Sequence, residues 1–103
     1  MLVTATQIKI KSIIGFFHFI PIVKKIWIQL TNADGLVFQK IKGFRTLTGW
    51  ETKEAMKAFR NNGHHLDGMK NVKKVGKAKS ITWETHPEPH WSEANEKLRG
   101  VQF

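Results

Sequence analysis

The sequence predicts an α+β fold of the ferredoxin-like type, with strands and helices in the order βαββαβ and an antiparallel sheet. The clearest observation is a pair of β-prone runs, 36–42 and 44–50, which meet at Gly43 and predict a hairpin. A helical pattern stands on either side of this hairpin, and a strand-like run stands beyond each helical pattern. We therefore expect both helices to lie on one face of a four-stranded sheet.

The first third of the chain predicts one strand and one helix. Residues 1–11 alternate and predict a strand, and "SIIGFFHF" (12–19) predicts an aromatic loop or a short helical turn. The helix then begins at Pro21, because the missing N–H of proline costs nothing at the first helical position. Apolar residues over 22–30 are spaced to give one buried face, and Gly35 suits the left-handed conformation that ends a helix.

The second half of the chain predicts a second helix, a fourth strand and a terminal helix. Thr52 is the expected N-cap of the second helix, which "NNG" (61–63) breaks. "AKSITWET" (78–85) predicts the fourth strand. Ser92 is the expected N-cap of the terminal helix, and Gly100 lies past its end. We expect all 103 residues to form one domain.

The predicted hairpin strands carry apolar side chains on both faces. Phe38 and Trp50 lie on one parity, and Ile41 and Leu47 lie on the other. Two helices cover only one face of a sheet, and a bare apolar face is unstable in water. We therefore expect a second copy of the sheet to cover the other face in a two-fold homodimer.

Charge and composition limit the classes of function. The chain has 17 lysines and arginines against 8 acids, a net charge of +9, and no cysteine. Disulfides, thiolate metal sites and cysteine nucleophiles are therefore excluded. Five lysines fall within residues 70–79 without an acid: Lys70, Lys73, Lys74, Lys77 and Lys79. This patch is either a solvated loop or a binding site for nucleic acid or another anionic surface.

The apolar stretch 13–30 does not predict a membrane span. His18, Pro21, Lys24 and Lys25 interrupt it, so no apolar run approaches the ~20 residues that a spanning helix needs. No small-residue cleavage site follows the stretch, and we expect no signal peptide. We expect a cytoplasmic protein without membrane contact.

A strand that ends in "GWET", an "EAMKAF" helix, a histidine and methionine beyond it, and "ITWET" (81–85) together resemble the dimeric α/β-barrel superfamily of the antibiotic-biosynthesis-monooxygenase type. Within it they are most similar to a branch like spheroidene monooxygenase. The matching positions are Trp50, Glu51, Glu54, Ala55, Met56, Phe59, His65 and Met69. The resemblance covers roughly residues 36–98. It implies two ferredoxin-like subunits whose sheets form a barrel, each with a cleft for an aromatic, polyketide-like or haem-type ligand.

Members of this superfamily include cofactor-independent oxygenases, haem-degrading enzymes and proteins that only bind a ligand. The haem-degrading motif, registered on "KNV" (70–72), puts its helix tryptophan on Phe59 and its iron-ligating histidine on Met69. A lone thioether is a poor substitute for imidazole on iron. Only a shift of four or five residues would let His64 or His65 bind haem iron. We therefore expect no cofactor. Haem is the alternative, and the position expected for its iron ligand is occupied by Met69.

The adjacent histidines are candidates for catalysis rather than for metal binding. On a helix, His64 and His65 point about 100° apart and cannot share one metal ion, so we expect no metal site. His65 is the candidate general base near neutral pH, with His64 beside the ligand. The alternative is that this pair caps the broken helix.

Aromatic side chains are the other candidates for ligand binding. Trp50 and Trp83 end adjacent elements and either stack on a flat ligand or fill the core. Phe59 lies on the core face of its helix, and the resemblance moves Met69 toward the pocket. Phe17, in "FFHF", belongs either to a lid over the pocket or to a hydrophobic staple for the following helix.

The sequence thus predicts a monooxygenase-like protein that binds or acts on an apolar or aromatic ligand in a cleft between sheet and helices. The alternative is a module that binds nucleic acid or an anionic surface through the Lys70–Lys79 patch.

Overall fold

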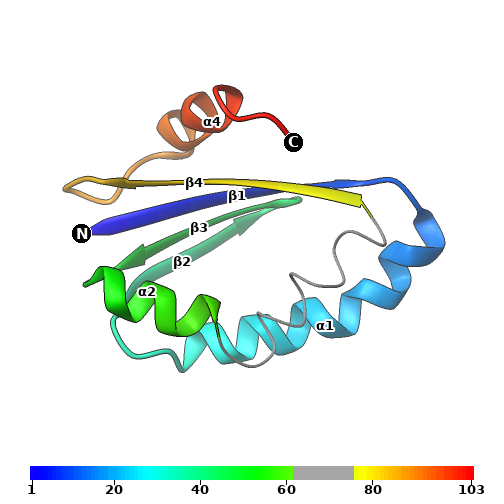
Figure 1. The fold of residues 1–103 in the computed structure, drawn as a ribbon, viewed down its shortest axis with the longest axis horizontal. Helices are drawn as coiled ribbons and strands as arrows, with labels where there is room; N and C mark the ends of the chain where they lie inside the picture. Colours follow the sequence, from blue (N-terminus) through cyan, green and yellow to red (C-terminus); the bar gives the residue numbers. More distant parts are fainter. Residues whose placement is uncertain (62–75) are drawn as a thin grey trace.

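Strands and helices follow one another in the order βαββαβα in this computed structural model, which describes residues 1–61 and 76–103 (Figure 1). The elements are β1 (Leu2–Ile10), α1 (Ile13–Thr31), β2 (Leu36–Lys42), β3 (Arg45–Trp50), α2 (Lys53–Arg60), β4 (Gly76–Glu84) and α4 (Trp91–Arg99).

The four strands form one antiparallel sheet in the order β2-β3-β1-β4. β1 lies in the centre, and its residue Leu2 pairs with Trp50 of β3 and with Glu84 of β4. β2 and β3 form the predicted hairpin, whose turn contains Gly43 at a φ of 61°. Gly35 follows α1 at a φ of 81°, a conformation that glycine adopts without steric cost. The predicted fold class is confirmed.

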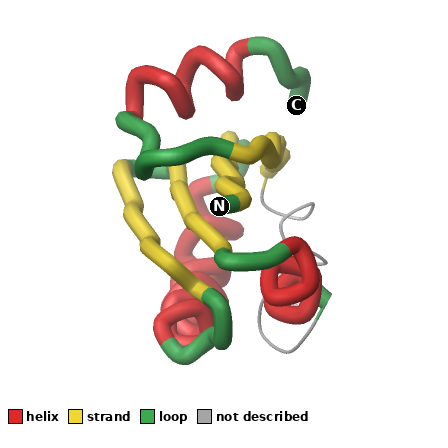
Figure 2. The backbone as a smooth tube through the Cα atoms, turned by 90° about the vertical axis from the view of Figure 1, so that its left-hand side faces the viewer, coloured by secondary structure: helices red, strands yellow, loops and turns green. Residues whose placement is uncertain are grey.

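The helices lie on both faces of the sheet. α1 and α2 lie on one face, and α4 lies on the other (Figures 1 and 2). Alternation along the central strands directs side chains to the two layers. On β1, Val3 and Ala5 point toward α4, whereas Thr4 and Thr6 line the space below α1 and α2.

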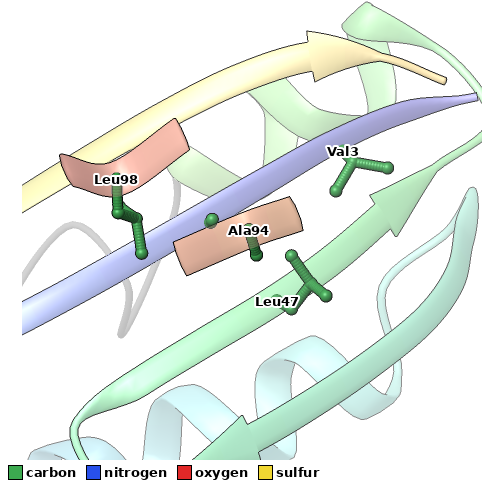
Figure 3. Packing of buried hydrophobic residues seen from close by; sticks show 5 residues of the cluster. Val3, Leu47, Ala94 and Leu98 are labelled. Atoms are coloured by element: carbon green, nitrogen blue, oxygen red, sulfur yellow. The ribbon is translucent and has the colours of Figure 1, made fainter. Parts of the chain in front are cut away.

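A compact apolar cluster joins α4 to the sheet (Figure 3). Its fully buried members are Val3, Ala5, Leu47, Ala94 and Leu98, none more than 1% exposed. Burial of apolar side chains on both sides of this contact is the main source of its stability. The face that the sequence analysis assigned to a second copy is therefore covered by the chain's own terminal helix. The predicted bare sheet face is not present, and the homodimer itself stays a prediction.

α1 is longer than the sequence predicts. It begins at Ile13 rather than at Pro21, and Ser12 is its N-cap, with the Ser12 hydroxyl accepting a hydrogen bond from the Gly15 N–H at 3.2 Å. Pro21 lies inside the helix, where it removes one backbone hydrogen bond. Burial of Phe19 and Leu30, which lie on either side of the proline, favours one continuous helix over this local cost.

Of the two other predicted N-caps, one is confirmed and one is wrong. At α2 the prediction is confirmed, since the Thr52 hydroxyl accepts a hydrogen bond from the Ala55 N–H at 3.1 Å. At α4 it is wrong: Ser92 already lies within the helix, and His90 occupies the N-cap without a side-chain cap bond. Burial of Pro89 just before the helix fixes where the chain enters it, so packing overrides the better capping residue.

The contact between α4 and the sheet can be tested by truncating Leu98. We expect Leu98→Ala to lower the free energy of unfolding by about 2–5 kcal/mol, because it leaves a cavity in a fully buried cluster. Chemical denaturation followed by circular dichroism measures this change. Arg99→Ala, at the exposed neighbouring position, is the matched control and should stay within about 0.5 kcal/mol. If Leu98→Ala and Arg99→Ala lower the free energy of unfolding by the same small amount, α4 does not pack on this sheet in solution.

Candidate functional site

A cavity of about 190 Å³ lies between the sheet and the two helices α1 and α2. Its floor is a row of threonines on the two central strands: Thr4 and Thr6 from β1, and Thr46 and Thr48 from β3. Thr4 pairs with Thr48 and Thr6 with Thr46 in the strand register, so their small side chains lie side by side. Short side chains at the centre of the sheet leave the space that bulkier residues would fill.

Aromatic and aliphatic side chains form the walls. Trp50 is 1% exposed, and its ring centroid lies 5.3 Å from that of Phe59 at an interplanar angle of 32°. The remaining described lining residues are Ile8, Phe19, Val23, Ile26, Trp27, Leu30, Ile41, Met56, Arg60 and Ala78. α1 supplies five of these, so the inner face of this helix is largely the wall of the cavity. The site is predominantly apolar, as expected for a small-molecule pocket.

The threonine hydroxyls give this apolar cavity its polar atoms. The Trp50 Nε1–H donates to the Thr48 Oγ1 at 3.0 Å, and the Thr48 hydroxyl donates to the Thr4 carbonyl at 3.4 Å. The Thr4 hydroxyl lies 3.1 Å from the Met56 Sδ and 2.9 Å from the Thr82 Oγ1. The buried indole N–H is therefore satisfied, and the walls are held by side-chain bonds as well as by packing.

Arg60 is the charged residue among the described residues that line the cavity. It lies at the end of α2, and its Nη2 is 4.0 Å from the Met56 Sδ. A guanidinium presents several N–H donors in a fixed plane, and it can bind a carboxylate or a phenolate oxygen. The arrangement can thus hold a flat apolar molecule and orient one polar substituent.

Two of the predicted ligand-binding residues meet at this cavity, namely Trp50 and Phe59. Two others lie elsewhere. Trp83 packs on the opposite face of the sheet, against the cluster that includes Leu98, with the Lys97 Nζ 5.4 Å from its ring centroid. The pairing of both tryptophans around one cleft is therefore wrong, because their side chains point to opposite faces.

Phe17 also lies away from the cavity. It is 65% exposed on the outer side of α1, in ring contact with Phe16 at 6.0 Å. His18, the next residue, is exposed as well. Since "FFHF" lies within α1, neither the lid nor the staple that the sequence suggested describes it. His64, His65 and Met69 lie outside the described residues.

The threonine floor, Trp27 and Arg60 line the cavity without having been predicted as site residues. A signal for the floor was present, since Thr4 with Thr6 and Thr46 with Thr48 each recur at the spacing of two that marks one face of a strand. No local pattern distinguishes Trp27 from an ordinary core residue of an amphipathic helix. Its place in the wall depends on how α1 lies over the sheet.

The lysine patch and the candidate cofactors find limited support among the described residues. Lys79 donates a hydrogen bond to the Val101 carbonyl at 3.1 Å and lies over the Phe103 ring, whereas Lys77 is exposed. The other three lysines lie outside residues 1–61 and 76–103, so nucleic-acid binding stays a prediction. Within those same residues, no group of three or more His, Cys, Asp or Glu side chains could hold a metal ion.

Haem does not fit the part of the cavity that the structure describes. Its volume exceeds only modestly the ~150 Å³ that holds benzene, and haem has four pyrrole rings. The described lining contains no histidine, and the sulfur of Met56 is in contact with Thr4 and Arg60. These residues offer iron no suitable axial ligand.

Comparison with known proteins supports the fold. No protein-family model and no curated protein matches the sequence. Among solved structures, an antibiotic biosynthesis monooxygenase superposes with a TM-score of 0.72 at 11% identity, over 84% of this chain and 100% of that one. SnoaB, a cofactor-independent oxygenase from Streptomyces nogalater, gives 0.67 at 6% identity, over 84% and 93%. A dimeric ferredoxin-like protein from Jannaschia sp. CCS1 gives 0.69 at 10%, over 82% and 98%.

The chain therefore has the ferredoxin-like fold of the antibiotic-biosynthesis-monooxygenase type, and the resemblance inferred from sequence is confirmed at that level. The branch similar to spheroidene monooxygenase stays a prediction. At these identities the likeness concerns the fold, and the function has to be argued from the site.

The bond between Trp50 and Thr48 can be tested with an isosteric change. We expect Thr48→Val to lower the free energy of unfolding by about 1–3 kcal/mol, because it leaves the buried indole N–H without its acceptor. Urea denaturation monitored by circular dichroism measures the change. Thr46→Val, on the same strand and the same cavity floor, is the matched control. If both variants lose the same stability, the hydrogen bond to Trp50 is not what Thr48 contributes.

Proposed function

We propose that this protein binds a small aromatic molecule in the cavity between the sheet and helices α1 and α2, and oxygenates it without a tightly bound cofactor. The observation that carries the proposal is the apolar cavity itself, walled by Trp50, Phe59 and Trp27 and floored by threonines. A monooxygenase-like fold with such a cavity supports small-molecule binding over a purely structural role.

The size of the cavity limits the ligand class. An apolar cavity of about 150 Å³ holds benzene, so the 190 Å³ here fits a single substituted ring or two fused rings. Longer isoprenoid chains and multi-ring polyketides exceed this space. We therefore narrow the expected apolar or aromatic ligand to a one- or two-ring aromatic.

The polar atoms suggest how the ligand is oriented. An aromatic ring between Trp50 and the aliphatic wall of α1 has its edge over the threonine floor, where Thr46 and Thr6 can exchange hydrogen bonds with a hydroxyl. Arg60 can stabilise a phenolate, the electron-rich form that reacts with oxygen. A phenol is therefore the ligand that this lining suits best.

The reaction balances without an external reductant for a phenolic substrate. A phenol and dioxygen give a quinone and water: one oxygen atom enters the ring, the other leaves as water, and the substrate supplies all the electrons. The protein would contribute orientation, exclusion of water and one base. The proposed base is His65, with His64 and Met69 near the ligand, and these three lie outside the described residues. SnoaB, which shares the fold, is a cofactor-independent oxygenase, and this supports the absence of a cofactor here.

The homodimer belongs to the same proposal. The similar Jannaschia protein is a dimer, which supports pairing of this chain too. Because α4 covers the centre of the sheet face that was expected to pair, the contact must involve α4 or another surface.

Ligand binding can be tested by narrowing the cavity. Ala78 of β4 lines it, and Ala78→Trp places a large ring at its edge. We expect 1-naphthol to raise the melting temperature of the unmodified protein and to bind the variant at least about tenfold more weakly, because the ring takes the ligand's space. Thermal shift and isothermal titration measure these effects.

Lys77→Trp is the matched control for this test. Lys77 is the neighbouring residue on the same strand, is exposed and does not line the cavity. Affinity retained by Lys77→Trp and lost by Ala78→Trp assigns the ligand to this cavity. Equal affinities of both variants, or no stabilisation of the unmodified protein by phenols and naphthols, would contradict the proposal.

Oxygenation is tested by following 1-naphthol under isotopically labelled dioxygen. We expect 1,4-naphthoquinone carrying one labelled oxygen atom, detected by mass spectrometry, and a rate at least about a hundredfold lower for His65→Ala, because a general base is lost. His18→Ala, at an exposed position that does not line the cavity, is the control and should retain most of the rate. If 1-naphthol binds but no labelled product forms, the protein binds this ligand without oxygenating it, and the proposed oxygenase activity is rejected.

A further inference from the structure

The outer face of α1 is unusually apolar for a helix exposed to water. Its largest exposed apolar side chains are Ile13 at 75%, Ile14 at 74%, Phe17 at 65% and Ile28 at 63% exposure. Ile13, Phe17, Pro21 and Ile28 are spaced by four, four and seven residues, so they follow one side of the helix, with the exposed Lys24 between Pro21 and Ile28. Single exposed apolar residues are ordinary, whereas several on one side of a helix mark a surface for an apolar partner.

The apolar row continues from the helix onto the sheet. The ring of Phe16 lies 5.5 Å from that of Phe44, which lies in the β2–β3 turn and is 52% exposed. Phe16 also contacts Phe17 at 6.0 Å. The turn and the first part of α1 therefore form one aromatic surface, drawn from segments that are far apart in sequence. We call the residues Ile13, Ile14, Phe17, Pro21, Ile28 and Phe44 the outer apolar surface.

Positive charge lies on and beside this surface. The first 50 residues contain seven lysines and arginines and a single acid, Asp34. Three exposed lysines belong to α1 or directly precede it: Lys11 just before the helix, and Lys24 and Lys25 within it. An apolar helix face with lysines beside it is the pattern of helices that lie in the headgroup region of an anionic bilayer.

α1 has two apolar sides, and this decides how it would meet a bilayer. By length and composition the helix could cross a membrane, although only 11% of the relevant stretch is buried in the fold. Its inner side, however, packs on the sheet through Phe19 and Leu30 and forms the wall of the cavity. Spanning would remove that side from the sheet. A helix that keeps this packing can only lie parallel to the membrane surface.

We propose that the outer apolar surface docks this protein on an anionic lipid bilayer, with α1 in the plane of the interface. The apolar side chains enter the boundary between headgroups and acyl chains, and Lys11, Lys24 and Lys25 bind acidic headgroups. The expectation of no membrane contact rested on the absence of a long apolar run, a criterion for spanning helices that docking does not need. The proposal does not depend on the function of the cavity.

Charge distinguishes a bilayer from the other occupants of this surface. A second copy docked on the same face would bring Lys24 and Lys25 of two subunits near each other, and like charges oppose such a contact. Nucleic acid would satisfy the lysines but would leave Ile13 and Phe17 in water. An anionic bilayer offers acidic headgroups to the lysines and an apolar interior to Ile13 and Phe17.

Vesicle flotation of the full chain tests the proposal. We expect binding to vesicles of phosphatidylcholine containing about a third phosphatidylglycerol and much weaker binding to phosphatidylcholine alone. The double variant Ile13→Gln/Phe17→Gln should lower the partition coefficient by about tenfold or more. Lys24→Gln/Lys25→Gln should lower it by about fivefold per lysine, and added salt should reduce this difference.

Two matched controls isolate the surface. Val37→Gln alters an apolar side chain that is 50% exposed on β2, and Lys53→Gln/Lys57→Gln removes two exposed lysines from α2. We expect Val37→Gln to bind like the unmodified protein. The α2 double variant should lose much less binding than Lys24→Gln/Lys25→Gln. Circular dichroism checks that each variant folds, which the exposure of all these positions favours.

Several outcomes would overturn the proposal. They are no binding to either vesicle, equal binding to both, or equal losses in the α1 variants and their controls. Sedimentation equilibrium tests one more outcome that would overturn the proposal. If the unmodified protein is a dimer and Ile13→Gln/Phe17→Gln is a monomer, the surface binds a second copy of the chain. A dimer that this variant leaves intact is compatible with docking through α1 and supports the homodimer separately.

Discussion

Side chains on the two central strands alternate between the two faces of the sheet, and this alternation sets both the core and the cavity. On β1 and β3, one parity carries Val3, Ala5 and Leu47, and these side chains are fully buried beneath α4. The other parity carries threonines, which face α1 and α2. A shift of one residue in register would exchange these two sets. The α4 layer would then lose its apolar cluster, and the helix side would gain large side chains where the cavity now lies.

The cavity follows from the size of the residues on the threonine side. Threonine is β-branched and suits a central strand, yet it is too short to reach the helices packed above it. Trp50 and Phe59 close one part of the space, and the hydroxyl of Thr48 holds the indole of Trp50 in place. On the opposite side, Gly49 permits a close approach, since a Cβ at this position would lie 2.2 Å from the Phe38 ring. The sheet is therefore packed tightly on the α4 side and leaves a hollow below α1 and α2.

α1 connects the two proposals made for this protein, although each stands on its own residues. The inner side of the helix is the wall of a cavity suited to a small phenol, and its outer side presents apolar side chains among lysines to solvent. A helix with only one apolar stripe could serve one of these purposes. The unusual hydrophobicity of the segment 13–31 is therefore shared between the interior of the fold and its surface.

Features that depend on neighbouring residues could be predicted from the sequence. The β2–β3 hairpin with Gly43 at its turn, the left-handed Gly35, the Thr52 cap and the ferredoxin-like order all follow from local patterns, and the structure has them. Tertiary packing decided the rest. It kept Pro21 inside α1, overrode Ser92 as a cap, and placed α4 on the sheet face that the sequence predicts to be uncovered. It also placed the side chains of Trp83 and Trp50 on opposite faces of the sheet. Contacts between segments far apart in sequence outweigh local preferences of about a kilocalorie per mole, and a single sequence carries little trace of them.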